Sequence, residues 1–431
     1  MAVVSLFRGL LGLEHTAIEN VWWDGDVLVI DVRLMARQRD RCGRCRRRCA
    51  RYDAGRGRRR WRTLDHATTL TFLEADAPRV RCRDHGVVVA HVPWAAHGAG
   101  HTHTFDAQVA WLATRTSKSA ATQLMRIAWR TVGAIIARVW DAAEAASATD
   151  GLDGLTRIGI DEISYRRNLK FLTVVVDHDT GVLVWAGEGR SRAALSPFFD
   201  LLGTERCAQI THVSADGAAY IEEEVTDRCP NAVLGVDPFH VVKWANTALA
   251  RVRIDAWQQA RKLAKHDPKM LTGWARRHQV LPGRDLARGL KGARFALAKN
   301  PENLTDRQHA KLEWIATTDP RLYRAYLLKE ALRLVFQMPP DQAAFELDKW
   351  LAWARRCRIP AFVDLARTIH KFRPRILVAI EHQLSNGLIE GVNTKIRLLT
   401  RLAFGFHTSH ALIALAMLSL GRHRPAHPGR T

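Results

Sequence analysis

Long apolar runs are missing from the sequence, and none approaches the roughly 20 residues that a membrane-spanning helix needs. The apolar start at residues 1–13 contains Arg8 and has no small-residue cleavage site, unlike a secretory signal. These absences predict an intracellular protein without a role at a membrane.

Acidic residues are also scarce. The chain has 43 Asp and Glu against 65 Lys and Arg, which gives a formal net charge of +22. Such an excess favours a polyanionic partner, by default a nucleic acid. The hydrophobic fraction of 47% is that of ordinary globular proteins, which argues against a chain kept unfolded by its charge. The length of 431 residues predicts two or three domains.

Cysteine is a third shortage, with seven residues in the whole chain. An odd number outside a secretory context indicates free thiols or a metal site rather than a disulfide framework. Cys42 and Cys45 form one pair with knuckle spacing, and Cys82 and His85 form another. Together they would make a tetrahedral zinc site of three Cys and one His. Two alternatives stay open: Cys49 replaces one ligand, or the cysteines are incidental thiols.

An arginine-rich run surrounds the first of these pairs. Residues 37–62 contain thirteen Arg and only two Asp. This density repels itself unless phosphates neutralise it, and Arg binds phosphate through a bidentate fork. A solvated surface is the alternative, but such surfaces normally mix both signs. We therefore predict DNA contacts from this run, with Arg44, Arg46, Arg47, Arg58 and Arg59 as candidates.

The pattern becomes helical after residue 105. Residues 116–127 and 128–139 have the spacing of a short capped helix, a tight turn and a second helix, which is typical of a helix-turn-helix. Helical hairpins without a DNA role share this pattern, but the basic run upstream favours DNA. Arg130, Thr131 and Arg138 would then lie on the outward face of the second helix.

Residues 156–240 alternate β-like runs with a helical pattern, which predicts an α/β core. Asp161 follows the apolar strand at 158–160, and Asp216 follows the strand at 210–214. Glu390 lies near the start of a helix predicted at 386–397.

These three carboxylates would repel one another in a cluster unless cations occupied it. Oxygen ligands select Mg²⁺ or Mn²⁺, and two such ions stabilise the attacking and leaving oxygens of a phosphoryl displacement. Each acid has a plain alternative as a turn or cap residue. Asp237 is a rival for the second position, and His240 and Asn393 are candidates for supporting residues.

The order of these parts resembles the bacterial transposases of the ISL-three insertion-sequence family. There a zinc-binding module and a helix-turn-helix precede a catalytic domain with an Asp, Asp, Glu triad. The matching stretches cover nearly the whole chain in order and lie at residues 42–45, 82–86, 119–139, 158–162, 214–220, 236–243 and 385–395.

The resemblance implies a multidomain α/β protein with a ribonuclease H-like catalytic core interrupted by an all-helical insertion. It implies that Asp161, Asp216 and Glu390 are the catalytic triad and the ligands of two Mg²⁺ or Mn²⁺ ions. The expected segments are 1–104 for the N-terminal zinc-binding, DNA-binding module, 105–150 for the helix-turn-helix, 151–246 for the first part of the core, 247–384 for the insertion, and 385–431 for the last core helix and the tail.

The family's activity implies that the chain binds the terminal inverted repeats of its element, cuts there and joins the freed 3′ hydroxyls to target DNA. Its partners would be double-stranded DNA of the transposon ends and the target, and further copies of itself in a homodimer or larger assembly. We expect it in the bacterial cytoplasm, at the nucleoid.

Two other functions compete with this interpretation. A DNA-binding regulator derived from an inactive transposase would keep the binding modules, but here all three carboxylates are present. A recombinase with a tyrosine nucleophile needs a Tyr late in the chain. The five tyrosines are at positions 52, 165, 220, 323 and 326, none of them in the last hundred residues.

Overall fold

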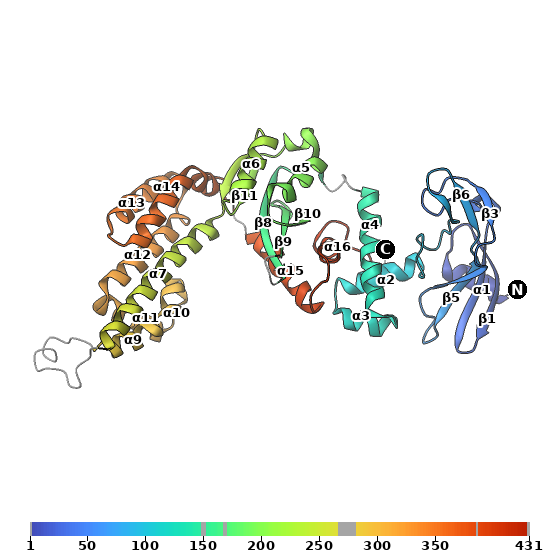
Figure 1. Cartoon of the computed structure of the whole chain (residues 1–431), viewed down its shortest axis with the longest axis horizontal. Helices are drawn as coiled ribbons and strands as arrows, with labels where there is room; N and C mark the ends of the chain where they lie inside the picture. The colour runs from blue at the N-terminus through green and yellow to red at the C-terminus, as the bar shows by residue number, and fades with distance from the viewer. Residues whose placement is uncertain (1, 148–151, 167–169, 266–281, 385–386, 429–431) are drawn as a thin grey trace, which may run out of the picture. The chain divides into compact units, whose positions relative to one another are not determined.

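The computed structural model describes residues 2–147, 152–166, 170–265, 282–384 and 387–428 (Figure 1). The chain divides into two compact units, one of residues 1–148 and 396–431 and the other of residues 149–395. Among the described helices, none combines the length and the apolar character that crossing a bilayer demands.

The first unit begins with a β-rich module, as the short alternating runs predict. A four-stranded sheet has the order β1-β2-β5-β4, and a three-stranded sheet has the order β3-β6-β7. Trp61 packs edge-on against Trp94 in the core of the larger sheet, with ring centroids 5.5 Å apart. The elements are α1 (Ala2–Leu11), β1 (Thr16–Asp24), β2 (Val27–Leu34), β3 (Ala50–Asp53), β4 (Arg58–Arg62), β5 (Thr71–Asp76), β6 (Arg79–Cys82) and β7 (Gly86–Val89).

Three helices follow, where helical spacing predicts them: α2 (His103–Ala113), α3 (Lys118–Met125) and α4 (Trp129–Ser147). The Ser117 hydroxyl accepts a hydrogen bond from the Ala120 amide and caps α3. Arg126 ends α3 in the left-handed conformation, which makes the tight turn into α4. This is the geometry of a helical hairpin with a short connection.

A fourth helix of this unit comes from the far end of the sequence. Helix α16 (Ser409–Leu420) packs on α4, and His410 contacts Asp141 at 3.0 Å. Residues 385–431 were predicted to contain one core helix and a tail, so α16 was not predicted as a separate helix. Its composition is apolar on all sides, so it lacks the periodic pattern that marks a half-exposed helix.

The second unit contains a five-stranded mixed sheet of order β10-β9-β8-β11-β12. Strand β8 lies in the middle, antiparallel to β9 and parallel to β11. All five strands overlap the runs predicted from sequence. Their bounds are β8 (Arg157–Arg166), β9 (Lys170–Asp177), β10 (Leu183–Glu188), β11 (His212–Ala215) and β12 (Val233–Val236).

Helices cover both faces of this sheet (Figure 1). Ile158 and Ile160 belong to a core shared with α5 (Arg192–Cys207) and α6 (Ala219–Arg228). Gly159 points to the opposite face, where Ile389 of α15 (Gly387–Leu402) lies so close that a Cβ on Gly159 would be 2.0 Å from its Cδ1. Only a residue without a side chain lets α15 approach β8 this closely.

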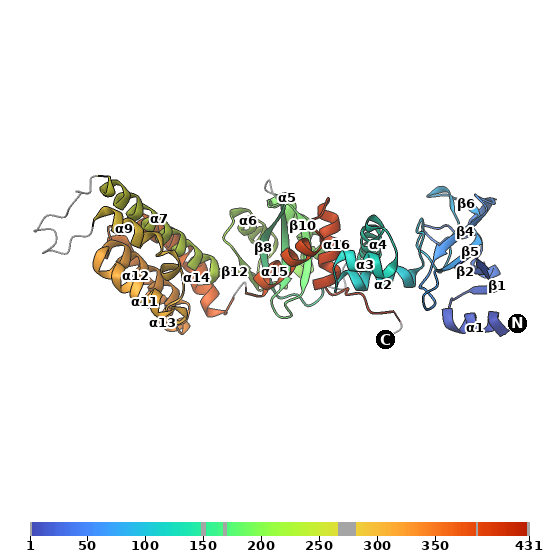
Figure 2. The ribbon, with the colours of Figure 1, turned by 90° about the horizontal axis from the view of Figure 1, so that it is seen from below.

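A helical block separates β12 from α15 in the sequence. It begins at Pro238, earlier than the expected boundary at 247, because Asp237 caps the first helix and proline is favoured at its first position. Helices α7 and α14 run side by side along it (Figure 2). The block contains α7 (Pro238–Ala264), α9 (Gly283–Lys291), α10 (Arg294–Ala298), α11 (Asp306–Thr318), α12 (Pro320–Val335), α13 (Pro340–Arg356) and α14 (Pro360–Glu381).

The contact between β8 and α15 generates the first prediction. We expect Gly159→Ala to lower the stability of the second unit by about 1–3 kcal/mol, because the new methyl group overpacks the interface. Ile389→Val in the same chain, which removes the colliding Cδ1, should recover part of the loss. Thermal unfolding measures both effects, and Gly391→Ala, whose Cβ would meet nothing within 4 Å, is the control. Equal stability of Gly159→Ala and the wild type would contradict the packing described.

Candidate functional site

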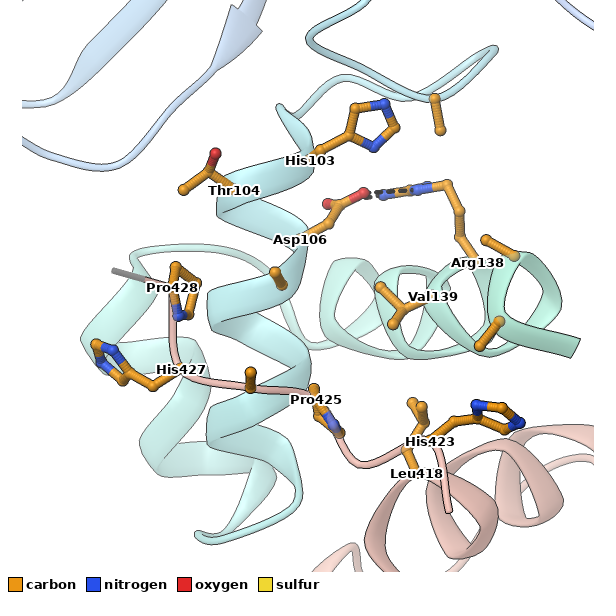
Figure 3. Close-up of a pocket in the computed structure, with 15 residues that line it drawn as sticks. His103, Thr104, Asp106, Arg138, Val139, Leu418, His423, Pro425, His427 and Pro428 are labelled. Carbon is orange, nitrogen blue, oxygen red and sulfur yellow. Dashed lines mark hydrogen bonds and ion pairs between the residues drawn. The ribbon is translucent and has the colours of Figure 1, made fainter. Parts of the chain in front are cut away.

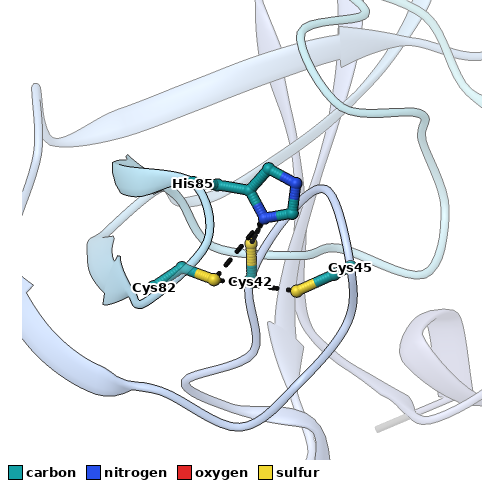
Figure 4. A group of neighbouring side chains, drawn as sticks. All are labelled: Cys42, Cys45, Cys82 and His85. Atoms are coloured by element: carbon teal, nitrogen blue, oxygen red, sulfur yellow. Dashed lines mark hydrogen bonds between the residues drawn. The ribbon is translucent and has the colours of Figure 1, made fainter.

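The four predicted zinc ligands converge from the knuckle before β3 and from the end of β6 with its turn into β7. Cys42, Cys45, Cys82 and His85 each offer one ligand atom, and these atoms all lie within 4.8 Å of one another. Figure 4 shows the four side chains pointing toward a common centre. The pairing of β6 with β3 and β7 brings the second knuckle next to the first.

The spacing of the ligand atoms fits a tetrahedral zinc ion. Cys45 Sγ and Cys82 Sγ are 3.7 Å apart, and His85 Nδ1 is 3.7 Å from Cys42 Sγ and 3.5 Å from Cys82 Sγ. In a zinc tetrahedron with its usual bond lengths, neighbouring ligand atoms lie about 3.5–3.8 Å apart. Cys49 is not a member of this group among the described residues, and its thiol donates to the Arg47 carbonyl instead. The donor set suits a structural zinc.

The arginine-rich run is partly neutralised inside the protein. Arg58 pairs with Glu74 at 2.8 Å and with Asp31 at 2.5 Å, and Arg60 pairs with Glu74 and Asp24. Acids on the neighbouring strands β1, β2 and β5 therefore balance the arginines of β4. The prediction that phosphates alone neutralise these arginines was incomplete. Which acids lie on the neighbouring strands depends on the strand pairing, which the sequence alone does not give.

The other predicted arginines of the run differ in their surroundings. Arg47 pairs with Asp84 at 2.8 Å, yet its side chain stays largely exposed. Arg59 donates to the carbonyl of Ala99 and lies over the Trp61 ring. Arg44 and Arg46 are exposed on the zinc knuckle, beside Cys45. Arg44 and Arg46 therefore keep positive charge exposed at the knuckle.

The residues predicted to contact DNA from the helix-turn-helix also differ in their exposure and in their partners. Arg130 is exposed in the first turn of α4, and Thr131 beside it is half-buried. Arg138 instead makes a bidentate ion pair with Asp106 of α2, at 2.8 and 3.0 Å (Figure 3). It lines a cavity of about 710 Å³ together with His423 and Pro425 of the C-terminal segment. Arg138 therefore holds α4 to α2 and does not lie on the outward face where it was expected.

The acidic site lies on the central strands of the second unit. Asp161, Asp216 and His240 offer ligand atoms that lie within 4.8 Å of one another. Asp161 does not end its strand as expected, because β8 continues to Arg166 in a hairpin with β9. Asp216 directly follows β11, as predicted, and its carboxylate accepts from the Ala218 amide at 3.0 Å.

Two of the predicted supporting residues contact this cluster. Asn393 Nδ2 donates to Asp161 Oδ2 at 2.7 Å, and its own buried Oδ1 has no partner among the described residues. His240 Nδ1 bonds Asp237 Oδ2 at 2.9 Å. Asp237 is 1% exposed and also caps α7 by accepting from the Phe239 amide. Asp237 thus orients His240 toward the two carboxylates.

The electrostatics of the cluster favour a bound cation. Burial, reinforced by the charges of Asp216 and Asp237, raises the pKa of Asp161 to about 6. The hydrogen bond to Asp237 raises the pKa of His240 above its usual range, and the charges of Asp161 and Asp216 add to this effect. A positive charge is therefore stabilised next to Asp161 and Asp216. A carboxylate pair of this kind is suited to a divalent cation.

Glu390 is not part of this group among the described residues. It is exposed in the first turn of α15, three residues before the buried Asn393. Residues 385 and 386, with which its motif begins, lie outside the described residues. His240 was predicted to have a supporting role, whereas in the structure one of its ring nitrogens lies within 4.8 Å of a carboxylate oxygen of both Asp161 and Asp216.

Comparison with known proteins gives three family matches. Residues 158–416 match a DDE-type family of the ISL3 group described as "Transposase". Residues 90–140 match the helix-turn-helix domain of transposase family ISL3, and residues 38–85 match the zinc-finger of transposases IS204, IS1001, IS1096 and IS1165. The matches follow the predicted order of zinc-binding module, helix-turn-helix and catalytic domain.

Two curated relatives extend over nearly the full length. The chain is 56% identical to the transposase for insertion sequence element IS1557 of Mycobacterium tuberculosis, over 100% of this chain and 98% of the relative. It is 25% identical to the transposase for insertion sequence element IS1001 of Bordetella parapertussis, over 93% and 94%.

The zinc cluster generates the second prediction. We expect the purified protein to contain about one zinc per chain, held by all four ligands. Cys82→Ser should remove most of the metal and lower the unfolding temperature, because a structural zinc contributes directly to folding. Cys49→Ser, which changes a cysteine outside the four-ligand group, should retain both the zinc and the unfolding temperature. Metal analysis by mass spectrometry and thermal unfolding measure the outcome. If Cys49→Ser lost the zinc and Cys82→Ser retained it, Cys49 would replace Cys82 as a ligand.

The third prediction follows from the difference between Arg130, which is exposed, and Arg138, which pairs with Asp106. Arg138→Ala leaves the carboxylate of Asp106, 5% exposed, without its partner, which should cost about 3 kcal/mol or more of stability. Arg130→Ala should leave the stability unchanged and weaken DNA binding. Thermal unfolding and fluorescence anisotropy with a labelled duplex separate the two effects. The reverse pattern would return Arg138 to the DNA interface.

Proposed function

Because this chain belongs to the transposase family ISL3 and is a DNA-acting transposase, we propose that it binds the terminal inverted repeats of its own insertion sequence and catalyses metal-dependent strand cleavage and strand transfer there. The observation that carries this proposal is the convergence of Asp161 and Asp216 beside His240. Two buried or half-buried carboxylates with a positive partner are what a divalent-cation site for phosphoryl transfer requires.

The sheet supports a ribonuclease H-like assignment for the catalytic core. Three antiparallel strands, β8 to β10, are followed by β11, which pairs in parallel with β8, and by β12, which pairs in parallel with β11, with α6 between these last two strands. The first acid lies on the central strand and the second directly follows β11. In this assignment the helical block from α7 to α14 is the insertion.

The proposed ligands of Mg²⁺ or Mn²⁺ are Asp161, Asp216 and Glu390. Two bound ions would supply the activation of the attacking water and the stabilisation of the leaving 3′ oxygen. Asn393 fixes one oxygen of Asp161, and the Glu162 amide donates to the other at 2.8 Å. The Ala218 amide fixes Asp216. These bonds set the orientation of the carboxylates before any ligand binds, so little reorganisation is needed during the reaction.

His240 has a second proposed role in this site. Its protonated ring, oriented by Asp237, offsets the repulsion between Asp161 and Asp216 while no cation is bound. We propose that His240 contacts the scissile phosphate as a hydrogen-bond donor.

DNA recognition is proposed for two surfaces of the first unit. The zinc knuckle contributes Arg44, Arg46 and Arg47, and the start of α4 contributes Arg130 and Thr131. Arg58 and Arg59 remain in the proposal with smaller roles, because their guanidinium groups already have partners in the protein. Two transposon ends must be held together for transfer, so we propose a homodimer or larger assembly on DNA.

The carboxylates generate the fourth prediction. Asp161→Asn, Asp216→Asn and Glu390→Gln should each lower the rate of end cleavage by about a thousandfold or more, because a two-ion site loses a ligand. Affinity for the ends should stay within about twofold of wild type, since binding depends on the other unit. A labelled duplex with the element's own terminus, incubated with Mg²⁺, measures cleavage, and Glu223→Gln on the exposed face of α6 is the control.

The same measurement tests the alternative function. A wild-type chain that binds the ends specifically but does not cut them with Mg²⁺ or Mn²⁺ would be a regulator derived from a transposase. Full activity of Glu390→Gln together with loss of activity in His240→Ala would move the third ligand from α15 to α7.

A further inference from the structure

The loop between α15 and α16 exposes an aromatic side chain beside the helix-turn-helix. Phe404 is 84% exposed, the highest value among the large hydrophobic side chains that the structure describes as exposed. Its ring centroid is 6.4 Å from that of Trp129, the first residue of α4. Both residues belong to the first unit. A large apolar surface left in water next to a DNA-reading helix calls for an explanation.

The backbone fixes the position of this ring. Helix α15 ends in a Schellman motif, in which the Phe404 amide donates to the Arg401 carbonyl at 3.0 Å and the Gly405 amide donates to the Thr400 carbonyl at 2.9 Å. Phe404 occupies the left-handed position of this motif, with a φ of 52°. Glycine is the residue that this position normally favours. The chain therefore keeps an aromatic residue where both the backbone and the solvent disfavour it.

The surroundings of Phe404 are basic. Residues 107–140, which include α3 and the first half of α4, contain no Asp or Glu, and neither do residues 391–431. The Lys118 ammonium lies over the Trp129 ring, 4.6 Å from its centroid. Arg130 is exposed next to Trp129, and Arg401 is exposed one turn before Phe404. An apolar ring among basic side chains is complementary to a base that lies between phosphates.

We propose that Phe404 is a DNA-contacting residue that inserts its ring against a base step of the duplex held by α4, with Trp129 as its neighbour. Phenylalanine is among the side chains that minor-groove proteins use as wedges, and stacking on a base tolerates any sequence. The C-terminal segment thus extends the helix-turn-helix surface with a residue that the helix-turn-helix itself lacks. This inference rests on the proposed function, in which α4 holds the terminal repeat.

The test compares Phe404→Ala, Phe404→Trp and Phe295→Ala in the full-length chain. Phe295 is a matched control, because it is 67% exposed on α10 in the other unit. Affinity is measured by fluorescence anisotropy at several salt concentrations, on a duplex with the element's terminus and on a scrambled duplex. A series of duplexes with 2-aminopurine at successive positions reports where a base is unstacked.

We expect Phe404→Ala to weaken binding to both duplexes about tenfold or more, the size of one lost base stack. The salt dependence of binding should stay unchanged, because no phosphate contact is removed. Arg130→Gln, in contrast, should reduce that dependence. Wild type and Phe404→Trp should increase 2-aminopurine emission at one step, and Phe404→Ala should not. Phe295→Ala should bind as wild type does.

Three results would overturn the proposal. Wild-type affinity of Phe404→Ala on both duplexes would remove Phe404 from the DNA interface. Loss of self-association in sedimentation, with DNA affinity retained, would make the ring a contact between copies of the chain. A lower unfolding temperature of the free protein, with DNA affinity retained, would make it an internal contact. The comparison of the two duplexes with wild type tests the proposed function separately, since end recognition requires a preference that stacking alone does not give.

Discussion

The catalytic unit depends on one close approach, that of α15 to strand β8 at Gly159. A side chain at this position would collide with Ile389, so the absence of one allows a helix from late in the sequence to lie against the central strand. As a result Asn393 reaches Asp161, although 232 positions separate the two residues. Glycine within a strand weakens it, and here that local cost is offset by a contact that joins the two ends of the unit. The helical block can be long because the sheet and α15 are tied together independently of it.

The arginines of this strongly basic chain differ in whether acids of the protein balance their charge. Arginines on β4 are balanced by acids on the strands beside it, while those of the zinc knuckle and of the start of α4 remain available. In the second unit the half-buried Asp161 and Asp216 lie close to each other and to His240. Binding a polyanion and binding a divalent cation require opposite potentials, and the sites proposed for these two tasks lie in different units. Net charge alone, which predicted the partner correctly, says nothing about this separation.

Much of the fold could be predicted from the sequence. The strands of the central sheet and the helices α2 to α4 follow from local periodicity, and the zinc ligands follow from spacing. The features that were missed depend on contacts between distant segments. Asp161 continues a strand because β9 pairs beyond it, and Arg138 faces inward because Asp106 lies opposite. Helix α16 has no amphipathic period because most of its side chains are buried, α4 being one of its partners. The place of Glu390 relative to the carboxylates is of the same kind, since it depends on the rotation of α15 and not on its helical character.

The packing of α16 on α4 has a consequence for synthesis. Asp141 and His410, which link these helices, are 269 positions apart. At a translation rate of about 5–20 residues per second, α4 leaves the ribosome roughly 15 to 50 s before the helix that covers it. During that interval α4 can pack on α2 and α3, but the part of its surface that α16 covers lacks its native partner. The helix-turn-helix is therefore completed late, and a product truncated before residue 409 would contain α4 without the helix that packs on it.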